Sequence, residues 1–419
     1  MNDHGIKRLM SRREALALAG KAAIGGAAAL GAPSILRAQT TETVKIGLVF
    51  AKQGVWTAQG QHLATGAEMA LAQAGNMVLG RKAEIVWYDE PSPQSAQQNL
   101  QKLVDSDRVI AVIGGTNSGT SLAMSSVANR NKVPYIAPNA AARNLTGADC
   151  NPYTFRVLTT TPVASAALAP ALLDIGKRWY FMSADYAYGQ DVYASMKAML
   201  DQAGGTEIGY DKTPLGTIDF SAFILKIRQA SPDVVVLGLP GGDLSNFLKQ
   251  YKEMGMKGRI PVACPVIGDS DLWDLSPDDA TGYYGKPWHF STPDNPEADK
   301  AFTREYMAKH DGKPPADKVW LGWFSMRALL AGIDAAKSLK GADIVGGLEE
   351  ARISDGTVPA YFRSWDHQML RRCMVFKVKD QITDKWDWLD LVAQEPKDPR
   401  GLDRLFGTPE QIGCKMGPR

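Results

Sequence analysis

The sequence predicts an α/β fold with two doubly wound parallel-sheet lobes joined by a multi-strand hinge. Apolar, strand-like runs alternate with helix-like segments, this alternation occurs twice in succession, and the chain then ends in elements without that rhythm. Continuous apolar strands between helices are typical of parallel sheets covered on both faces. Because the late elements have to complete lobes already built, we expect several crossings between the lobes and a cleft beside them.

The first alternation predicts the first lobe. Its strands are expected at residues 44–50, 83–89, 109–115 and 133–137. Its helices are expected at residues 60–74, at 92–105 and in a segment that ends at 129. With 419 residues, 45% of them hydrophobic, the chain can bury this core and a second one of ordinary domain size.

The second alternation predicts the second lobe. Its strands are expected at residues 178–182, 207–210, 233–238 and 260–263. Its helices are expected at residues 189–203, 220–230 and 243–254. The repeat of the same pattern indicates a second doubly wound sheet.

The late elements are two long helices and a pair of strands. The helices are expected at 294–310 and 320–339, and the antiparallel strands at 362–366 and 373–378 around a turn at 367–369. We therefore assign residues 42–158 and 290–363 to the first lobe, and residues 159–289 and 364–419 to the second.

Residues 1–38 have the pattern of an export signal. A basic region contains the pair Arg12-Arg13, a weakly apolar Ala/Gly/Leu-rich stretch follows, and Ala38 precedes the expected processing point. This order is typical of a signal peptide, and the paired arginines favour the twin-arginine route. An amphipathic helix or a short membrane anchor are the alternatives, but the stretch is short and Gly-rich for a membrane span. We expect a periplasmic mature protein.

The charge of the chain bears on its possible partners, and its cysteines bear on disulfide pairing. The whole chain carries +2, and without residues 1–38, which hold six basic and two acidic residues, it carries −2. A nucleic-acid partner is not expected, because it requires a clustered basic surface. Four cysteines (Cys150, Cys264, Cys373 and Cys414) allow three disulfide pairings, and we expect Cys414 to join the strand of Cys373.

Enzyme signatures are missing from the sequence. It contains no Gly-x-x-x-x-Gly-Lys-[Ser/Thr] phosphate loop and no Gly-x-Ser-x-Gly nucleophile elbow. The five histidines are scattered without metal-ligand spacing, and no Cys-x-x-Cys pair occurs. We expect no catalytic residue, no cofactor and no metal, although a Ser/His/acid triad assembled only in space stays open.

Four polar or small-residue loops follow predicted strands, at the edge where open parallel sheets bind ligands. They are residues 51–60, 114–121, 138–142 and 183–190. The second loop begins a helix, so its free backbone amides suit a carboxylate, although a simple helix cap explains the same residues. Tyr186 and Tyr188 in the fourth loop are equally consistent with amphipathic rim residues.

Together these segments resemble the branched-chain amino acid-binding protein family, the periplasmic binding proteins of type I fold that serve ABC transporters. The matching runs occur in order through residues 42–380, at 46–50, 112–115, 133–138, 185–190, 219–223, 232–236 and 246–250. The resemblance implies a monomeric carrier that closes its lobes on a small molecule and presents it to a membrane permease.

The resemblance also implies the binding residues. The loop after residue 115 would hold a ligand carboxylate, Tyr188 would close from the second lobe, and Gln59 stands where relatives often have an aromatic residue. The expected ligand-binding residues are Trp56, Gln59, Thr116, Asn117, Ser118, Gly119, Asn139, Ala140, Ala141, Tyr186, Tyr188, Gly241 and Val266.

One departure bears on the ligand. Amino acid-binding members have an acidic residue near Val266 for the ligand ammonium group, whereas this segment offers Pro265, Val266 and Ile267. Burying an ammonium group without a countercharge costs several kcal/mol. We therefore expect an aromatic or aliphatic carboxylate without an α-amino group, unless Asp185, Asp243 or Asp269 reaches the cleft. Amino acid or amide binding, a ligand sensor of the same fold, and an exported α/β enzyme are the alternatives.

Overall fold

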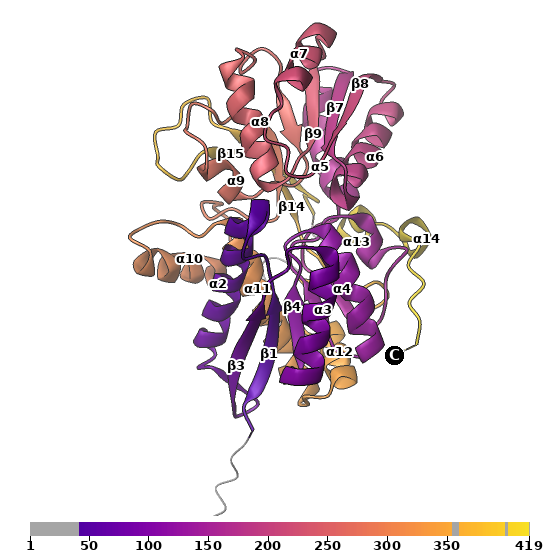
Figure 1. Ribbon diagram of the computed structural model, residues 1–419, viewed down its shortest axis with the longest axis vertical. Helices are drawn as coiled ribbons and strands as arrows, with labels where there is room; N and C mark the ends of the chain where they lie inside the picture. The colour runs from indigo at the N-terminus through magenta and orange to yellow at the C-terminus, as the bar shows by residue number, and fades with distance from the viewer. Residues whose placement is uncertain (1–41, 354–359, 399–400, 419) are drawn as a thin grey trace, which may run out of the picture. The chain divides into compact units, whose positions relative to one another are not determined.

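The computed structural model describes residues 42–353, 360–398 and 401–418, and the predicted export signal lies outside them. Within these ranges the chain forms two large sheets, each covered by helices, and one short two-stranded sheet (Figure 1). The predicted fold class, two doubly wound α/β lobes, is therefore confirmed.

The first sheet has the strand order β2-β3-β1-β4-β5-β6. All neighbouring strands run parallel except β2 and β3, which form an antiparallel pair. The strands of this sheet are β1 (Val44–Val49), β2 (Met77–Val78), β3 (Arg81–Tyr88), β4 (Ala111–Gly114), β5 (Tyr135–Ala137) and β6 (Thr154–Arg156).

Helices cover both faces of this sheet because alternate strand residues point opposite ways. Val49 lies in a core with Leu100 and Met124 of two neighbouring helices, whereas Leu48 lies in the larger core that includes Leu63. The helices and turns of this lobe are η1 (Gly54–Trp56), α2 (Thr57–Gln73), α3 (Pro93–Lys102), the π-turn η2 (Leu103–Asp107), α4 (Ser118–Asn131), η3 (Arg143–Thr146), α10 (Glu297–Lys309), α11 (Asp317–Ala336) and α12 (Gly341–Glu350).

The second sheet has the order β15-β14-β11-β10-β9-β7-β8, with β14 and β15 antiparallel to their neighbours. Its strands are β7 (Arg178–Ala184), β8 (Thr206–Thr213), β9 (Val234–Gly238), β10 (Val262–Cys264), β11 (Tyr283–Lys286), β14 (Cys373–Val378) and β15 (Leu389–Glu395). Its helices are α5 (Thr161–Leu173), α6 (Ala187–Gln202), α7 (Ser221–Ala230), α8 (Gly241–Glu253) and α9 (Asp269–Trp273).

The chain crosses to the second sheet after β6, returns after β11, and crosses again between the short strands β12–β13 (Tyr361–Phe362 and Met369–Leu370) and β14. Arg156 joins two of these crossings although its side chain is fully buried. Its guanidinium donates to Gln368 Oε1 (2.6 Å), to Ala142 O (2.5 Å) and to Thr146 Oγ1. A buried cation is tolerated here because each of its nitrogens has an acceptor.

Helices α2 and α11 pack at backbone contact, and glycine makes this possible. A Cβ atom on Gly322 would lie 1.9 Å from Leu63 O, and one on Gly66 would lie 1.9 Å from Val319 O. The side-chain-free positions therefore let each helix approach the carbonyl groups of the other.

The C-terminal segment returns to the first lobe. Cys414 forms a disulfide with Cys150, α13 (Leu402–Phe406) contacts β13, and Arg363 Nη1 donates to Gly407 O (2.9 Å). The expected Cys373–Cys414 pairing was wrong, since Cys373 is a buried free thiol. Assigning the whole segment 364–419 to the second lobe was likewise wrong for this tail.

The late strand pair was also mispredicted. Residues 373–378 pair with β11 and β15, and the partner of Tyr361–Phe362 is Met369–Leu370. Both short strands of the second pair come from one hairpin, so the apolar run at 373–378 was free to join the larger sheet, where both of its edges are hydrogen-bonded.

Candidate functional site

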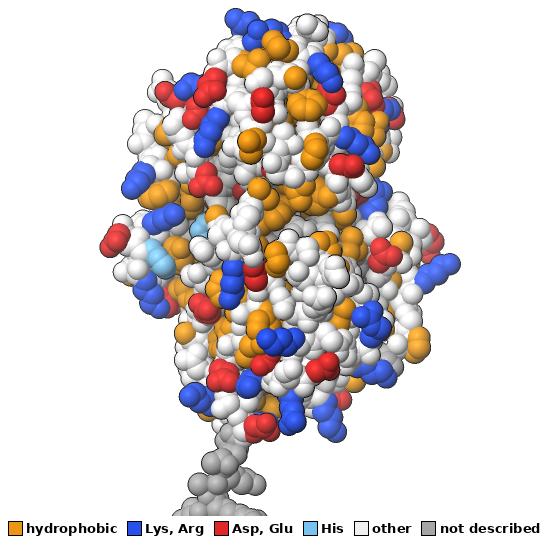
Figure 2. All heavy atoms as spheres, viewed as in Figure 1, with side chains coloured by type: hydrophobic (Ala, Val, Ile, Leu, Met, Phe, Trp, Pro, Cys, Tyr) orange, Lys and Arg blue, Asp and Glu red, His pale blue; other side chains and the backbone are white. Residues whose placement is uncertain are grey.

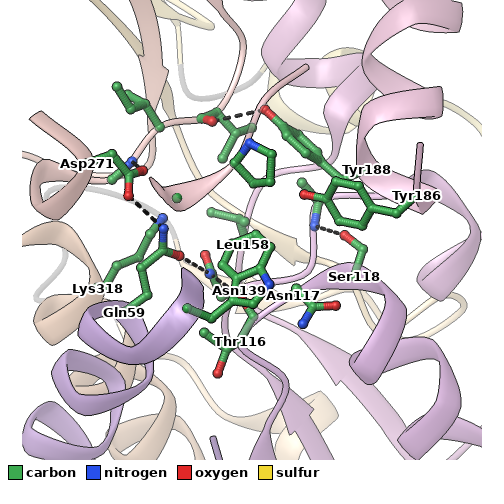
Figure 3. A pocket seen from close by; sticks show the side chains of 17 residues that line it. Gln59, Thr116, Asn117, Ser118, Asn139, Leu158, Tyr186, Tyr188, Asp271 and Lys318 are labelled. Atoms are coloured by element: carbon green, nitrogen blue, oxygen red, sulfur yellow. Dashed lines mark hydrogen bonds between the residues drawn. The ribbon is translucent and has the colours of Figure 1, made fainter. Parts of the chain in front are cut away.

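A cavity of about 350 Å³ lies among the loops at the C-terminal ends of both sheets (Figure 3). The cavity is lined by Trp56, Gln59, Thr116, Asn117, Ser118, Asn139, Ala141, Leu158, Tyr186, Tyr188, Pro240, Gly241, Val266, Ile267, Gly268, Asp271 and Lys318.

The N-terminus of α4 supplies hydrogen-bond donors to the cavity. Asn117 caps the helix by accepting from Thr120 N (3.1 Å), and within the described part of the chain the amides of Asn117, Ser118 and Gly119 have no acceptor. Ser118 Oγ accepts from the amides of Ala141 (3.2 Å) and Ala142 (3.1 Å), which leaves its hydroxyl proton available to donate. Backbone and hydroxyl donors at a helix N-terminus favour an anionic acceptor.

The amide of Thr116, which we expected to face the ligand, is already occupied. It donates to Glu90 Oε1 (2.6 Å), which also accepts from Thr120 Oγ1 (3.2 Å). Glu90 is only 3% exposed, and burial raises its pKa to about 8 even though its hydrogen bonds to Thr116 act in the opposite direction. The donor set for a ligand therefore begins at Asn117.

A hydrogen-bonded chain connects the two lobes across one side of the cavity. Asn139 Nδ2 donates to Thr116 O (2.7 Å) and to Gln59 Oε1 (3.1 Å), and Gln59 Nε2 donates to Asp271 Oδ1 (2.8 Å). Gln59 thus acts as a polar bridge from α2 to α9.

An aromatic wall closes the opposite side. The rings of Trp56 and Tyr186 meet edge to face with centroids 6.2 Å apart, and those of Tyr186 and Tyr188 lie 5.9 Å apart. Tyr188 OH donates to Val266 O (2.9 Å), which fixes its ring against the β10–α9 loop. Figure 2 shows hydrophobic side chains gathered along the boundary between the lobes. Such rings suit a flat or apolar ligand body.

Asp271 and Lys318 form a polar end that the sequence did not reveal. Asp271 accepts from Gln59 through Oδ1 and from Gly268 N through Oδ2 (2.9 Å), and burial raises its pKa to about 6. Lys318 is 3% exposed and lies 3.2 Å from Asp317 Oδ2. A carboxylate does therefore line the cavity, five positions after Val266, contrary to our reading of that segment.

The acidic residues that we had considered do not line the cavity. Asp185 pairs with Lys212 at the surface (3.5 Å), and the buried Asp243 accepts from Gly216 N (3.0 Å). Asp269 pairs with the fully buried Lys286 (2.5 Å). Although burial opposes its ionisation, Lys286 and His289 hold the pKa of Asp269 below its usual range.

Asp269 and Asp317 cap each other's helices across the lobes. Asp269 N donates to Asp317 Oδ1 and Asp317 N donates to Asp269 Oδ2, both at 2.8 Å. Because α9 belongs to the second lobe and α11 to the first, each lobe satisfies orphan amides of the other.

The structure brings together most of the residues expected from the sequence. All of them line the cavity except Gly119 and Ala140, which lie next to lining residues. The sequence missed Leu158, Gly268, Asp271 and Lys318.

A family model described as periplasmic binding protein matches residues 43–383. The chain belongs to this family. Leu/Ile/Val-binding protein homolog 6 of Brucella abortus (strain 2308) is 29% identical over 238 residues, which cover 55% of this chain and 60% of the relative. The match thus spans less than two thirds of that relative. It confirms the resemblance of this periplasmic binding protein to the branched-chain amino acid-binding family.

Solved structures confirm the type I fold of this periplasmic binding protein. A periplasmic binding protein from Burkholderia mallei is 26% identical, with a TM-score of 0.82, and the match covers 89% of this chain and 99% of that one. A solute-binding protein of an ABC transporter from Rhodopseudomonas palustris BisB5, in complex with 3,4-dihydroxybenzoic acid, is 21% identical with a TM-score of 0.77, covering 84% and 97%.

The described part of this binding protein shows neither a membrane-spanning helix nor a cluster of metal ligands. Among the helices in residues 42–353, 360–398 and 401–418, none has the length and apolar character needed to cross a membrane. Across the same ranges, no cluster of three His, Cys, Asp or Glu side chains is arranged for a metal ion.

Proposed function

We propose that this protein is the periplasmic solute-binding component of an ABC importer and that it binds a small carboxylate between its lobes. The observation that carries the proposal is the set of donors on Asn117, Ser118 and Gly119, beside a small cavity with walls from both lobes. A carboxylate fits these donors because charge-assisted bonds to helix N-terminal amides are among the stronger hydrogen bonds.

The favoured ligand is an aromatic or aliphatic acid without an α-amino group. Trp56, Tyr186 and Tyr188 would contact its body, and the Rhodopseudomonas palustris protein of similar fold binds 3,4-dihydroxybenzoic acid. Both oxygens of Asp271 already accept hydrogen bonds from the protein, and Lys318 lies at the same end of the cavity, so an ammonium group is not required to balance its charge.

An amino acid is the second candidate, because Asp271 is a carboxylate in the cavity wall. A ligand ammonium group placed beside it would replace Gln59 or Gly268 as a partner. The Brucella abortus relative carries a Leu/Ile/Val-binding name, which supports this alternative.

Thermal unfolding and calorimetry with a ligand panel test the function. Benzoate, 4-hydroxybenzoate, octanoate, leucine and a leucine amide are added to the purified protein. A ligand at about one hundred times its Kd should add roughly 2.7 kcal/mol of stability. Stabilisation by the acids alone supports the favoured ligand class, stabilisation by leucine supports the second, and no response to any of them contradicts a carboxylate-binding function.

Asp271→Asn separates the two ligand classes. If an ammonium group pairs with Asp271, the variant should lose at least tenfold in leucine affinity, and wild-type affinity should fall as the pH drops below the pKa of about 6. If the ligand is a plain acid, we expect less than a threefold change, or a gain, in calorimetric Kd. Asp274→Asn, an exposed position at the end of the same helix, is the matched control.

The remaining parts of the proposal concern delivery. Export by the twin-arginine route, a monomeric state and transfer of the ligand to a permease would be tested by ligand uptake in cells with and without the gene. Ligand binding without an effect on uptake would favour a sensor of the same fold. Turnover of a bound ligand would favour an enzyme.

A further inference from the structure

A second cavity, of about 580 Å³, lies where the connecting segments between the lobes meet. It shares no lining residue with the first cavity within the described chain. Its walls come from α10, α11, β14, β15 and the segment between β11 and α10, which Figure 1 shows near the boundary of the lobes.

Arg371 is the unusual residue of this cavity. Its side chain is 7% exposed, and Nη2 donates to Pro287 O (2.7 Å), but Nε and Nη1 have no hydrogen-bond partner among the described residues. The guanidinium stacks on Trp320 at 4.1 Å from the ring centroid. Leaving buried donors of a charged group unsatisfied is unfavourable, so this arrangement calls for an acceptor.

Two further buried donors at the same cavity also lack a hydrogen-bond acceptor in the part of the chain that the structure describes. Trp288 Nε1 and Arg372 Nε are buried without an acceptor in the described chain, although Arg372 Nη1 pairs with Asp294 at 2.8 Å. Two carboxylates also line the cavity: Asp299 accepts from Trp320 Nε1 (2.9 Å), and Asp294 accepts from Arg372 Nη1. Four buried donor atoms at this cavity, two of them on Arg371, nevertheless lack an acceptor among the described residues.

Part of the remaining lining is apolar and aromatic, and the polar residues Asp294, Asn295, Arg327 and Gln394 complete it. Trp288 and Trp320 stack with centroids 5.8 Å apart, and Phe324, Ile353 and Met374 belong to the same apolar part of the wall. A ligand with an anionic acceptor group on an apolar body would match the free donors of Arg371 and the aromatic part of this wall.

We propose that this cavity is a second binding site, for a small organic carboxylate whose oxygens accept from Arg371 and Trp288 and whose apolar body lies against Trp320 and Phe324. The site is independent of the cleft between the sheet edges, and it does not rest on the function proposed for that cleft.

Calorimetric titration of the purified protein with benzoate and with octanoate tests the proposal. To isolate the second site, the titrations are repeated in Ser118→Trp, which fills the first cavity. We expect a binding event that survives in Ser118→Trp and is weakened at least tenfold when Arg371→Gln is added. In 5-fluorotryptophan-labelled protein, the resonances of Trp288 and Trp320, identified with Trp288→Phe and Trp320→Phe, should shift during the same titration.

Controls separate this site from a folding defect and from the cleft. Arg304→Gln changes an exposed arginine of α10 and should leave the event unchanged. Ala298→Phe fills the second cavity while keeping Arg371, and it should remove the event even if Arg371→Gln does not fold. If Ser118→Trp abolishes binding in the first cavity while binding in the second cavity persists, the result agrees with both proposals.

The proposal is overturned if no event remains in Ser118→Trp, which would mean that ordered water satisfies these donors. It is equally overturned if the event persists undiminished in Ala298→Phe, or if Arg304→Gln weakens it as much as Arg371→Gln does.

Discussion

Glu90 accepts a hydrogen bond from the loop that offers donors to the ligand, and its burial should make the stability of the protein depend on pH. Its pKa is raised by burial to about 8, so the folded protein keeps a proton that the unfolded chain releases above its ordinary value of 4.5. Stability contributed by this group is therefore full below pH 4.5 and is lost as the pH rises towards 8. We expect the unfolding free energy of the wild type, relative to Glu90→Gln, to fall by about 1.4 kcal/mol per pH unit between pH 5 and 8.

Urea unfolding of both proteins at pH 5, 6.5 and 8 measures this difference. Glu84→Gln, which changes an exposed carboxylate on β3, should show no such trend. A constant difference between wild type and Glu90→Gln across the range would mean that Glu90 ionises normally.

At the scale of elements, the contact between α2 and α11 depends on glycine. Alanine is normally better than glycine inside a helix by about 1 kcal/mol. At Gly322, however, a Cβ atom would lie 1.9 Å from Leu63 O, so the helices would have to separate. We expect Gly322→Ala to lower the unfolding free energy by about 1–3 kcal/mol despite its better helix propensity. In denaturant unfolding, Ala335→Ser at an exposed position of α11 should stay within about 0.5 kcal/mol of wild type.

At the scale of the whole molecule, the Cys150–Cys414 disulfide connects residues 264 positions apart and holds the C-terminal tail on the first lobe. Closing so long a loop restricts the unfolded chain, and removing a disulfide typically costs about 2–4 kcal/mol. We expect the Cys150→Ser/Cys414→Ser protein to unfold at a lower temperature than wild type. Dithiothreitol should lower the Tm of wild type to that of the double variant and leave the variant unchanged. An equal response of both proteins would mean that the effect of dithiothreitol does not come from the Cys150–Cys414 disulfide.

Much of the fold could be predicted because most strands are continuous apolar runs between turns. Two of the missed strands have a different character. Thr154–Arg156 contains a buried arginine whose acceptors lie in the preceding segment 142–146 and at the distant Gln368, and Leu389–Glu395 is partly exposed at a sheet edge. Tertiary contacts, which the local sequence does not show, decide both.

The candidate site was predictable mainly in the loops and first helical turns that directly follow predicted strands. Trp56, Ser118 and Tyr188 follow strand ends, the edge at which parallel sheets bind ligands. Asp271 and Lys318 lie in the first turns of α9 and α11, and the sequence does not show which side of those turns faces the cavity.

The reciprocal capping of Asp269 and Asp317 has a consequence for anyone who recombines binding proteins. A second lobe grafted from this protein onto the first lobe of a relative brings Asp269 and Lys286 with it, but it leaves Asp317 behind. Unless the recipient supplies a carboxylate at that position, the amide of Asp269 at the start of α9 loses its acceptor. Lys286 also loses the second carboxylate near its ammonium group, which is 3.9 Å away in this protein. A working chimera therefore needs matching residues at the seam as well as matching lobes.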